Sequence, residues 1–208
     1  ILERGFELLV LTNAMKPMEH KREALLNVLS RYGSQMVLRI SVDHFSQALH
    51  EEERGENTWA PMVKGLQWLS AHGFAIDVAG RTRWNDKEDD LRHGFARLFN
   101  SLDVSVDAQN PKELMLFPEM DEGAEVPEIT TDCWGILNVD PNDMMCATSR
   151  MVVKRKGDDS PRVAACTLLP YDPQFDMGAT LAEASQPVIL NHPHCARFCV
   201  LGGASCSA

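Results

Sequence analysis

The chain has 208 residues, of which 44% are hydrophobic and 24% charged, a composition ordinary for a folded globular protein. Its 20 basic and 30 acidic residues give a formal net charge of -10, which disfavours binding to phosphate backbones and anionic lipids. No apolar run approaches the about 18 residues of a membrane-spanning helix, and no signal-peptide pattern is present. We therefore expect no nucleic-acid or membrane partner, and a cytoplasmic location.

Up to about residue 120, short apolar runs alternate with longer segments of helical periodicity. The strand-like runs cover residues 6–14, 36–44, 74–82 and 113–120. The helical segments between them cover residues 19–33, 56–73 and 86–103. This alternation predicts right-handed crossovers and a parallel sheet that binds ligands at the carboxyl ends of its strands. Four such strands fit part of a doubly wound sheet or part of a barrel.

A charged segment, "HEEERGE" at residues 50–56, follows the second expected strand. A run of this kind is typical of a solvated loop, and we interpret it as one. His44 and His50 are six positions apart without a helical pattern around them. We therefore expect both histidines to lie on the surface or in a loop.

The character of the sequence changes after Pro118. Residues 1–132 contain no cysteine, whereas residues 133–208 contain all six. Residues 149–169 read as two strands around the turn "KGDDSP". We therefore expect two domains, residues 1–125 and residues 126–208, the second being a small cysteine-rich module of a β-hairpin and helix.

The six cysteines are candidate metal ligands: Cys133, Cys146, Cys166, Cys195, Cys199 and Cys206. The last three lie in "CARFCVLGGASC", whose two glycines allow the backbone to fold closely around a cluster. Without an export signal, clustered thiols indicate metal binding more than disulfides. An iron-sulfur cluster takes thiolates, whereas zinc would also accept His192 or His194. For Cys133, a small buried apolar side chain is an equal alternative.

Three strand ends, "LTNA", "RISVDH" and "VAGRT", followed by a thiol-rich region, resemble the radical S-adenosylmethionine (radical SAM) superfamily. More narrowly, the chain resembles members with a SPASM or twitch-like extension. Asn13 lies in the position of the family's Thr-Asn-Gly, and Ser41 and Asp43 match its Ser-x-Asp. Cys146 and Cys166 flank a glycine-containing hairpin similar to that of the extension.

The resemblance implies a partial (β/α) barrel over residues 1–125 and an auxiliary 4Fe-4S cluster held by the cysteines of residues 126–208. It also implies S-adenosylmethionine contacts from five residues at the strand ends: Asn13, Ser41, Asp43, Gly80 and Arg81. Ser41 would bond the ribose or amino-acid end and Asp43 would accept from hydroxyls or the ammonium. Gly80 would permit close approach and Arg81 would pair with the carboxylate. Thr-Asn and Ser-x-Asp also end strands as ordinary caps and turns, which remains the alternative.

The function implied is generation of a 5′-deoxyadenosyl radical to modify a peptide or small-molecule substrate, with an electron-donor protein as partner. The family's Cys-x3-Cys-x2-Cys loop, which holds a second 4Fe-4S cluster, is absent from the sequence. We expect that loop and two further strands to precede Ile1, so that this chain alone would be inactive. The alternative is a non-catalytic binding or scaffold fragment stabilised by zinc or an iron-sulfur cluster.

Overall fold

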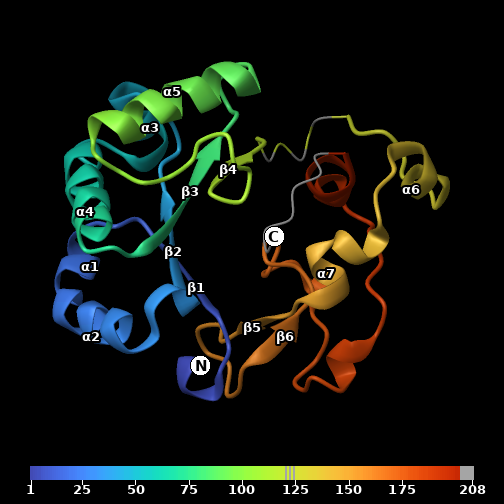
Figure 1. Cartoon of the computed structure of the whole chain (residues 1–208). Coiled ribbons are helices and arrows are strands. Elements are labelled where there is room, and N and C mark those ends of the chain that lie inside the picture. Colours follow the sequence, from blue (N-terminus) through green and yellow to red (C-terminus); the bar gives the residue numbers. More distant parts are fainter. Residues whose placement is uncertain (120, 122, 124, 202–208) are drawn as a thin grey trace. The chain divides into compact units, whose positions relative to one another are not determined.

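The computed structural model describes residues 1–119, 121, 123 and 125–201, and the chain divides into two compact units, Ile1–Glu119 and Met120–Ala208 (Figure 1). The strands of the first unit are β1 (Leu8–Thr12), β2 (Met36–Ser41), β3 (Ala75–Arg81) and β4 (Leu114–Phe117). Its helices are α1 (Lys16–Glu19), α2 (Arg22–Tyr32), α3 (Gln47–Arg54), α4 (Trp59–Ala71) and α5 (Glu88–Ser101), with 3-10 turns at Leu2–Arg4 and Gly33–Gln35.

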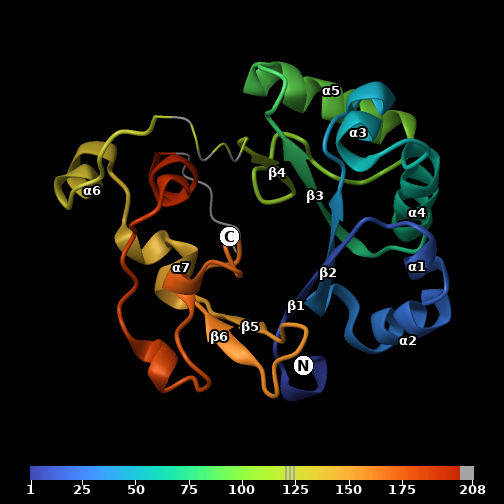
Figure 2. The ribbon, with the colours of Figure 1, turned by 180° about the vertical axis from the view of Figure 1, so that it is seen from behind.

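The four strands of the first unit form one parallel sheet in the order β1-β2-β3-β4. Right-handed crossovers that always move to the next strand in one direction place their helices on a single face. Figures 1 and 2 show α2, α4 and α5 on the same side of the sheet. The α/β class and the parallel sheet predicted from the sequence are thus confirmed.

The core of the first unit lies between the helices and one face of the sheet, here called the helix face. Burial alternates along β3, so successive side chains point to opposite sides. The largest fully buried side chains of this core come from β2, α4, α5 and β4: Leu38, Ile40, Met62, Leu66, Leu69, Phe95, Phe99 and Leu114. Burying each of these stabilises the unit by about 1.5–3 kcal/mol.

The opposite face, here called the polar face, carries charged and hydroxyl side chains. Arg39 lies directly beside Asp77 on the neighbouring strand, with Nη2 3.2 Å from the carboxylate Oδ2. Arg39 is buried, and burial raises the pKa of Asp77 although the guanidinium opposes that shift. Ser41 and Arg81 continue this face to the carboxyl ends of β2 and β3.

The loop after β1 is pressed against α4 at Gly65. A Cβ added to Gly65 would lie 1.8 Å from the carbonyl oxygen of Ala14. Ala14 is fully buried with a φ of 56°, a left-handed conformation that side chains disfavour. The glycine in α4 is therefore required for the loop to reach its position at the strand end.

The charged segment at residues 50–56 is not a solvated loop, because its first part is the second half of α3. Ser46 begins this helix, and its hydroxyl accepts a hydrogen bond from the Leu49 N–H at 3.5 Å. His50 is 1% exposed and His44 is 2% exposed. His44 lies in the loop between β2 and α3, as expected, but it is buried there, and the expectation of a surface or loop position is wrong for His50, which is buried in α3.

The second unit is built from short elements: α6 (Asp132–Leu137), α7 (Met145–Thr148), β5 (Met151–Val153) and β6 (Arg162–Ala164). It also contains 3-10 turns at Pro141–Asp143, Pro173–Phe175 and Glu183–Ser185, and a π-helix at Cys195–Leu201. β5 and β6 pair antiparallel, which confirms the predicted hairpin. Among the residues described in either unit, none belongs to a helix with the length and apolar character needed to cross a membrane.

Ion pairs link the β5–β6 hairpin of the second unit to Asp176, which follows the 3-10 turn Pro173–Phe175. Arg162 grips the Asp176 carboxylate with Nε and Nη2, each 2.6 Å from an oxygen, and Arg155 adds a contact of 3.3 Å. The Gly178 N–H donates to the same carboxylate at 3.0 Å. Arg162, then this backbone bond, holds the pKa of Asp176 far below its usual value of 3.8.

Candidate functional site

Three cysteine thiols of the second unit come together from segments that are far apart in the sequence. Cys146 lies in α7, Cys166 follows β6, and Cys195 opens the π-helix. Ionisation of Cys166 affects both other thiols, and that of Cys146 also affects Cys195, so all three lie within electrostatic reach. Cys166 and Cys195 also share a small apolar cluster with Phe175. Each of the three thiols thus comes from a different element: α7, the segment after β6, and the π-helix.

Burial raises the pKa of two of these thiols, Cys146 and Cys195, and so favours their protonated form. Cys195 is 6% exposed, and burial, followed by the neighbouring Cys166, raises its pKa to about 11. Burial and then Cys166 likewise raise the pKa of Cys146. Three anionic sulfurs would repel one another here, so thiolates require a cation that neutralises them. A thiophilic metal centre supplies such a charge.

The other three predicted sulfur ligands are Cys133, Cys199 and Cys206, and they lie in separate parts of the second half of the chain. Cys199 is half-buried and lies four positions after Cys195 in the π-helix, so the two share one side of a helical turn. Cys133 lies in α6, with its sulfur 4.0 Å from the Thr130 hydroxyl. Cys206 lies outside the described residues. Cys133, Cys146, Cys166 and Cys195 are free thiols.

Within the described ranges, no group of three or more His, Cys, Asp or Glu side chains has an arrangement that could hold a metal ion. A single zinc ion needs every sulfur about 2.3 Å from one point. A 4Fe-4S cluster instead holds each thiolate on a different iron, so its sulfurs lie farther apart.

The two histidines proposed as alternative zinc ligands lie just before Cys195. His192 Nδ1 accepts the His194 N–H at 3.1 Å, and its Nε2 is 4.0 Å from the Asp172 carboxylate. The two rings meet edge to face with centroids 4.8 Å apart. His192 is therefore oriented by its own loop and by Asp172.

In the first unit, the predicted ligand Asp43 is buried at the end of β2 and paired with Arg54 of α3. Arg54 Nη2 lies 3.2 Å from Oδ1, and Nε donates to Oδ2. Asp43 is 2% exposed, whereas the Arg54 side chain is 38% exposed. Both oxygens of the carboxylate are thus engaged by one guanidinium, which is a strong bidentate geometry.

Two buried histidines flank this pair. His50 Nδ1 is 3.8 Å from Asp43 Oδ2 and has no hydrogen-bond partner among the residues described. His44 Nδ1 accepts the Ser46 N–H at 2.9 Å, and its Nε2 is 3.6 Å from Asp86. Burial lowers the pKa of both imidazoles, against the opposing charges of Asp43 and Asp86. Both histidines are therefore neutral at pH 7.

The predicted ligand Arg81 is also paired. Its guanidinium contacts Glu53 of α3 and lies 3.3 Å from the Glu119 carboxylate. Glu53 bridges to Arg83 as well. The Arg81 N–H donates to the Asp43 carbonyl at 2.9 Å, so the ends of β2 and β3 are joined by backbone and side chains.

The remaining predicted residues of the first unit have distinct roles. Asn13 Oδ1 accepts the Met15 N–H at 3.1 Å and so shapes the turn after β1. Gly80 is on the helix face, where a Cβ would lie 2.9 Å from Phe95 and Leu116, so packing accounts for this glycine. Ser41 is half-buried on the polar face, and within the described part of the chain its hydroxyl makes no hydrogen bond. Among the predicted strand-end contacts, the Ser41 hydroxyl is thus not engaged by another described side chain.

Searches of protein-family models, of curated proteins and of solved structures found no match to this chain.

The sequence analysis did not place the α3 side chains that contact Asp43 and Arg81 at the carboxyl ends of β2 and β3. His50, Glu53 and Arg54 stand three and four positions apart and share one side of the helix. Ser46, a preferred helix N-cap, precedes them and was the available signal. A helix that begins after Ser46 predicts that these three side chains face the same side, and in the structure that side faces the strand ends.

Proposed function

We propose that this chain is part of a radical SAM enzyme whose second unit holds an auxiliary 4Fe-4S cluster. The observation that carries the proposal is that Cys166 and Cys195 share one apolar cluster and that Cys146, from a third segment, lies within electrostatic reach of both. Converting neighbouring buried thiols to thiolates requires a cation, and an iron-sulfur cluster would supply that charge. Cys199, on the same side of the helical turn as Cys195, is the candidate fourth ligand.

The sheet of the first unit supports the same proposal. Sequential strand order with helices on one face is the arrangement of a (β/α) barrel, whereas a doubly wound sheet reverses its strand order. The polar face would then line the inside of the barrel. Ser41 ends β2 on that face, where it would hydrogen-bond S-adenosylmethionine.

In such an enzyme, S-adenosylmethionine bound at an iron-sulfur centre supplies radical chemistry, and the protein supplies position and exclusion of water. The described residues would hold the ribose or amino-acid end through Ser41. Asp43 and Arg81 could contribute only by exchanging their present partners, Arg54 and Glu53. A peptide or small-molecule substrate and an electron-donor protein remain part of the proposal.

Iron content tests the cluster directly. The 208-residue chain is reconstituted without oxygen using ferrous iron and sulfide. It should then bind about four iron atoms per chain and absorb light at about 400 nm. Cys195→Ser should lower bound iron strongly, because it removes one of the converging ligands. Cys133→Ser is the matched control and should retain iron, because Cys133 contacts Thr130. Equal iron in the wild-type chain and Cys195→Ser, or binding of a single zinc ion, would contradict the cluster.

Binding of S-adenosylmethionine by calorimetry tests the first unit. Ser41→Ala should weaken binding about threefold to tenfold, since one hydrogen bond is lost. Ser105→Ala, an exposed serine outside the strand ends, is the control. Equal affinities in the two variants would remove Ser41 from the site.

The paired state of Asp43 and Arg81 favours a second candidate, a non-catalytic scaffold stabilised by zinc or an iron-sulfur cluster. In that case metal should raise the thermal stability of the chain, while S-adenosylmethionine should not bind. The two measurements above therefore distinguish the enzyme from the scaffold.

A further inference from the structure

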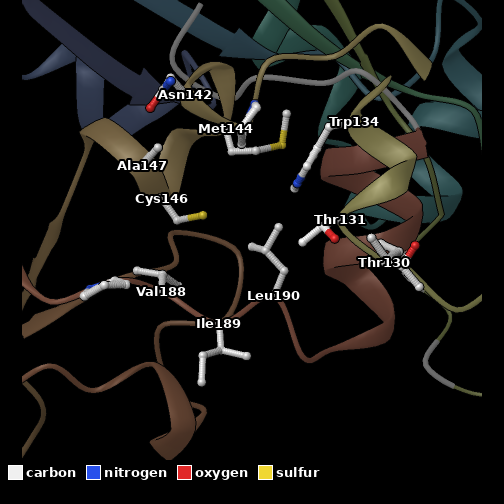
Figure 3. A pocket seen from close by; sticks show the side chains of 13 residues that line it. Thr130, Thr131, Trp134, Asn142, Met144, Cys146, Ala147, Val188, Ile189 and Leu190 are labelled. Carbon is white, nitrogen blue, oxygen red and sulfur yellow. The ribbon is translucent and has the colours of Figure 1, made fainter. Parts of the chain in front are cut away.

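A cavity of about 480 Å³ lies inside the second unit, between segments 129–147 and 187–190 (Figure 3). Small-molecule sites have volumes of about 300–1,000 Å³, so this space is of suitable size. Figure 3 shows Trp134, Cys146 and Leu190 directed toward the same space from α6, α7 and the later segment. The cavity is therefore walled by side chains from three parts of one unit.

The wall of this cavity carries no charge. Of the 13 described residues that line it, none has an acidic, basic or imidazole side chain, although 24% of the whole chain is charged. Trp134 offers an aromatic face, and Met144 and Cys146 offer polarisable sulfur, which packs well against rings. A charged ligand would lose its hydration here without gaining a counterion. The lining thus selects a neutral, mainly apolar molecule.

Two polar groups at the wall remain available to orient such a molecule. Thr131 precedes α6 as its N-cap residue, yet its side chain makes no capping hydrogen bond. The amide nitrogen of Asn142 donates to Asp140 at 2.9 Å, which leaves its carbonyl oxygen as an acceptor. One hydroxyl and one carbonyl oxygen among apolar side chains are the usual composition of a specific small-molecule site.

We propose that this cavity binds a neutral, ring-containing small molecule that stacks on Trp134 and hydrogen-bonds Thr131. The proposal does not depend on an iron-sulfur cluster, because the cavity is formed by the folded second unit. The lining of Trp134, Met144 and Leu190 supplies the contact area, and Thr131 fixes the orientation of a carbonyl or hydroxyl on the ring.

The test uses prodan, a neutral naphthalene dye with a ketone, whose emission shifts to the blue in apolar sites. The 208-residue chain should bind one prodan with a saturable shift. Thr131→Arg should weaken binding at least about tenfold, because the guanidinium enters the apolar space. Thr148→Arg is the matched control: Thr148 is likewise exposed, ends α7 and is not part of the wall, so binding should be unchanged.

Two further measurements define the ligand class. Thr131→Val keeps the shape of the side chain and should weaken prodan about threefold to tenfold through loss of the hydroxyl. The anionic dye 8-anilinonaphthalene-1-sulfonate should bind at least about tenfold more weakly than prodan. Circular dichroism confirms that each variant is folded.

Several outcomes would overturn the proposal. Prodan binding that never saturates, or an equal loss in both arginine variants, would show that no defined site exists. Equal affinity for the anionic dye would refute the neutral class. A chain that forms dimers disrupted by Thr131→Arg, without binding prodan, would show that the cavity is instead an interface between copies.

Discussion

The two units of this chain are stabilised in different ways. The first unit has a parallel sheet covered by helices, and its core draws buried side chains from β2, β3, β4, α4 and α5, with Leu8 and Val10 of β1 partly buried against it. The second has strands of three residues, and among the described residues the apolar cluster around Phe175 has Ala165 and Cys195 as its other buried members. Further buried side chains come from α7, β6 and the π-helix, among them Met145, Val163 and Phe198, and the ion pairs of Asp176 add polar contacts. The first unit thus depends on one continuous core, whereas the second combines a smaller apolar cluster with ion pairs.

The largest expected effect is steric and falls on the first unit. Gly65→Ala forces a methyl group against the Ala14 carbonyl, where a Cβ would lie at 1.8 Å. Because backbone on both sides must shift, we expect a loss of about 3 kcal/mol in the free energy of unfolding. Urea unfolding followed by tryptophan fluorescence measures it, since the first unit contains Trp59, Trp68 and Trp84.

The matched control lies in the second unit. A Cβ on Gly135 of α6 meets no atom within 4 Å. Gly135→Ala should therefore stabilise the helix by about 0.5–1 kcal/mol. Fluorescence of Trp134, the tryptophan of the second unit, follows that change. Equal effects from the two alanines would refute the close approach of the β1 loop to α4.

A smaller effect is expected from the ion pair at the end of β2. Arg54→Met leaves the Asp43 carboxylate buried without its cation and should cost about 2 kcal/mol. The cost is below that of a fully buried pair because the Arg54 side chain is 38% exposed. The double variant Asp43→Asn, Arg54→Met should recover part of the loss in a urea double-mutant cycle. Additive losses would show that the two side chains do not interact.

The smallest effect depends on pH and separates the units most sharply. Burial lowers the pKa of His44 and His50 from 6.5, so the unfolded chain binds their protons more readily. The stabilisation that depends on the neutral forms of His44 and His50 is fully present above pH 6.5 and decreases as the pH falls below 6.5. In the second unit the pKa of Asp176 is lowered, so its stabilisation is present above pH 3.8 and lost below.

Urea titrations at successive pH values, read from the two sets of tryptophans, test this order. The midpoint for the first unit should fall between pH 6.5 and pH 5 while that of the second changes little. His50→Gln should flatten the first profile. Profiles that move together, or a His50→Gln profile that matches that of the wild-type chain, would contradict the assignment.

Much of the first unit could be predicted because its pattern is local. Strand β3 buries alternate side chains, and helices α4 and α5 bury side chains three or four positions apart, periods that the sequence displays directly. The prediction of a loop at residues 50–56 was wrong because charge suggested solvent, whereas α3 directs Arg54 and Glu53 to the strand ends. The sequence suggested the thiols as a set but could not indicate that Cys146, Cys166 and Cys195 meet.

The amino-acid sequence by itself determined the α/β class, the parallel strands and the later hairpin, because periodic burial and turn residues act over short distances along the chain. Only the tertiary structure decided that Arg54 forms an ion pair with Asp43 and that His44 and His50 are buried. It also decided that Gly80 packs against Phe95. Each of these is a contact between segments remote in the sequence. The partner in such a contact depends on where the whole chain places both side chains, and no local pattern records it.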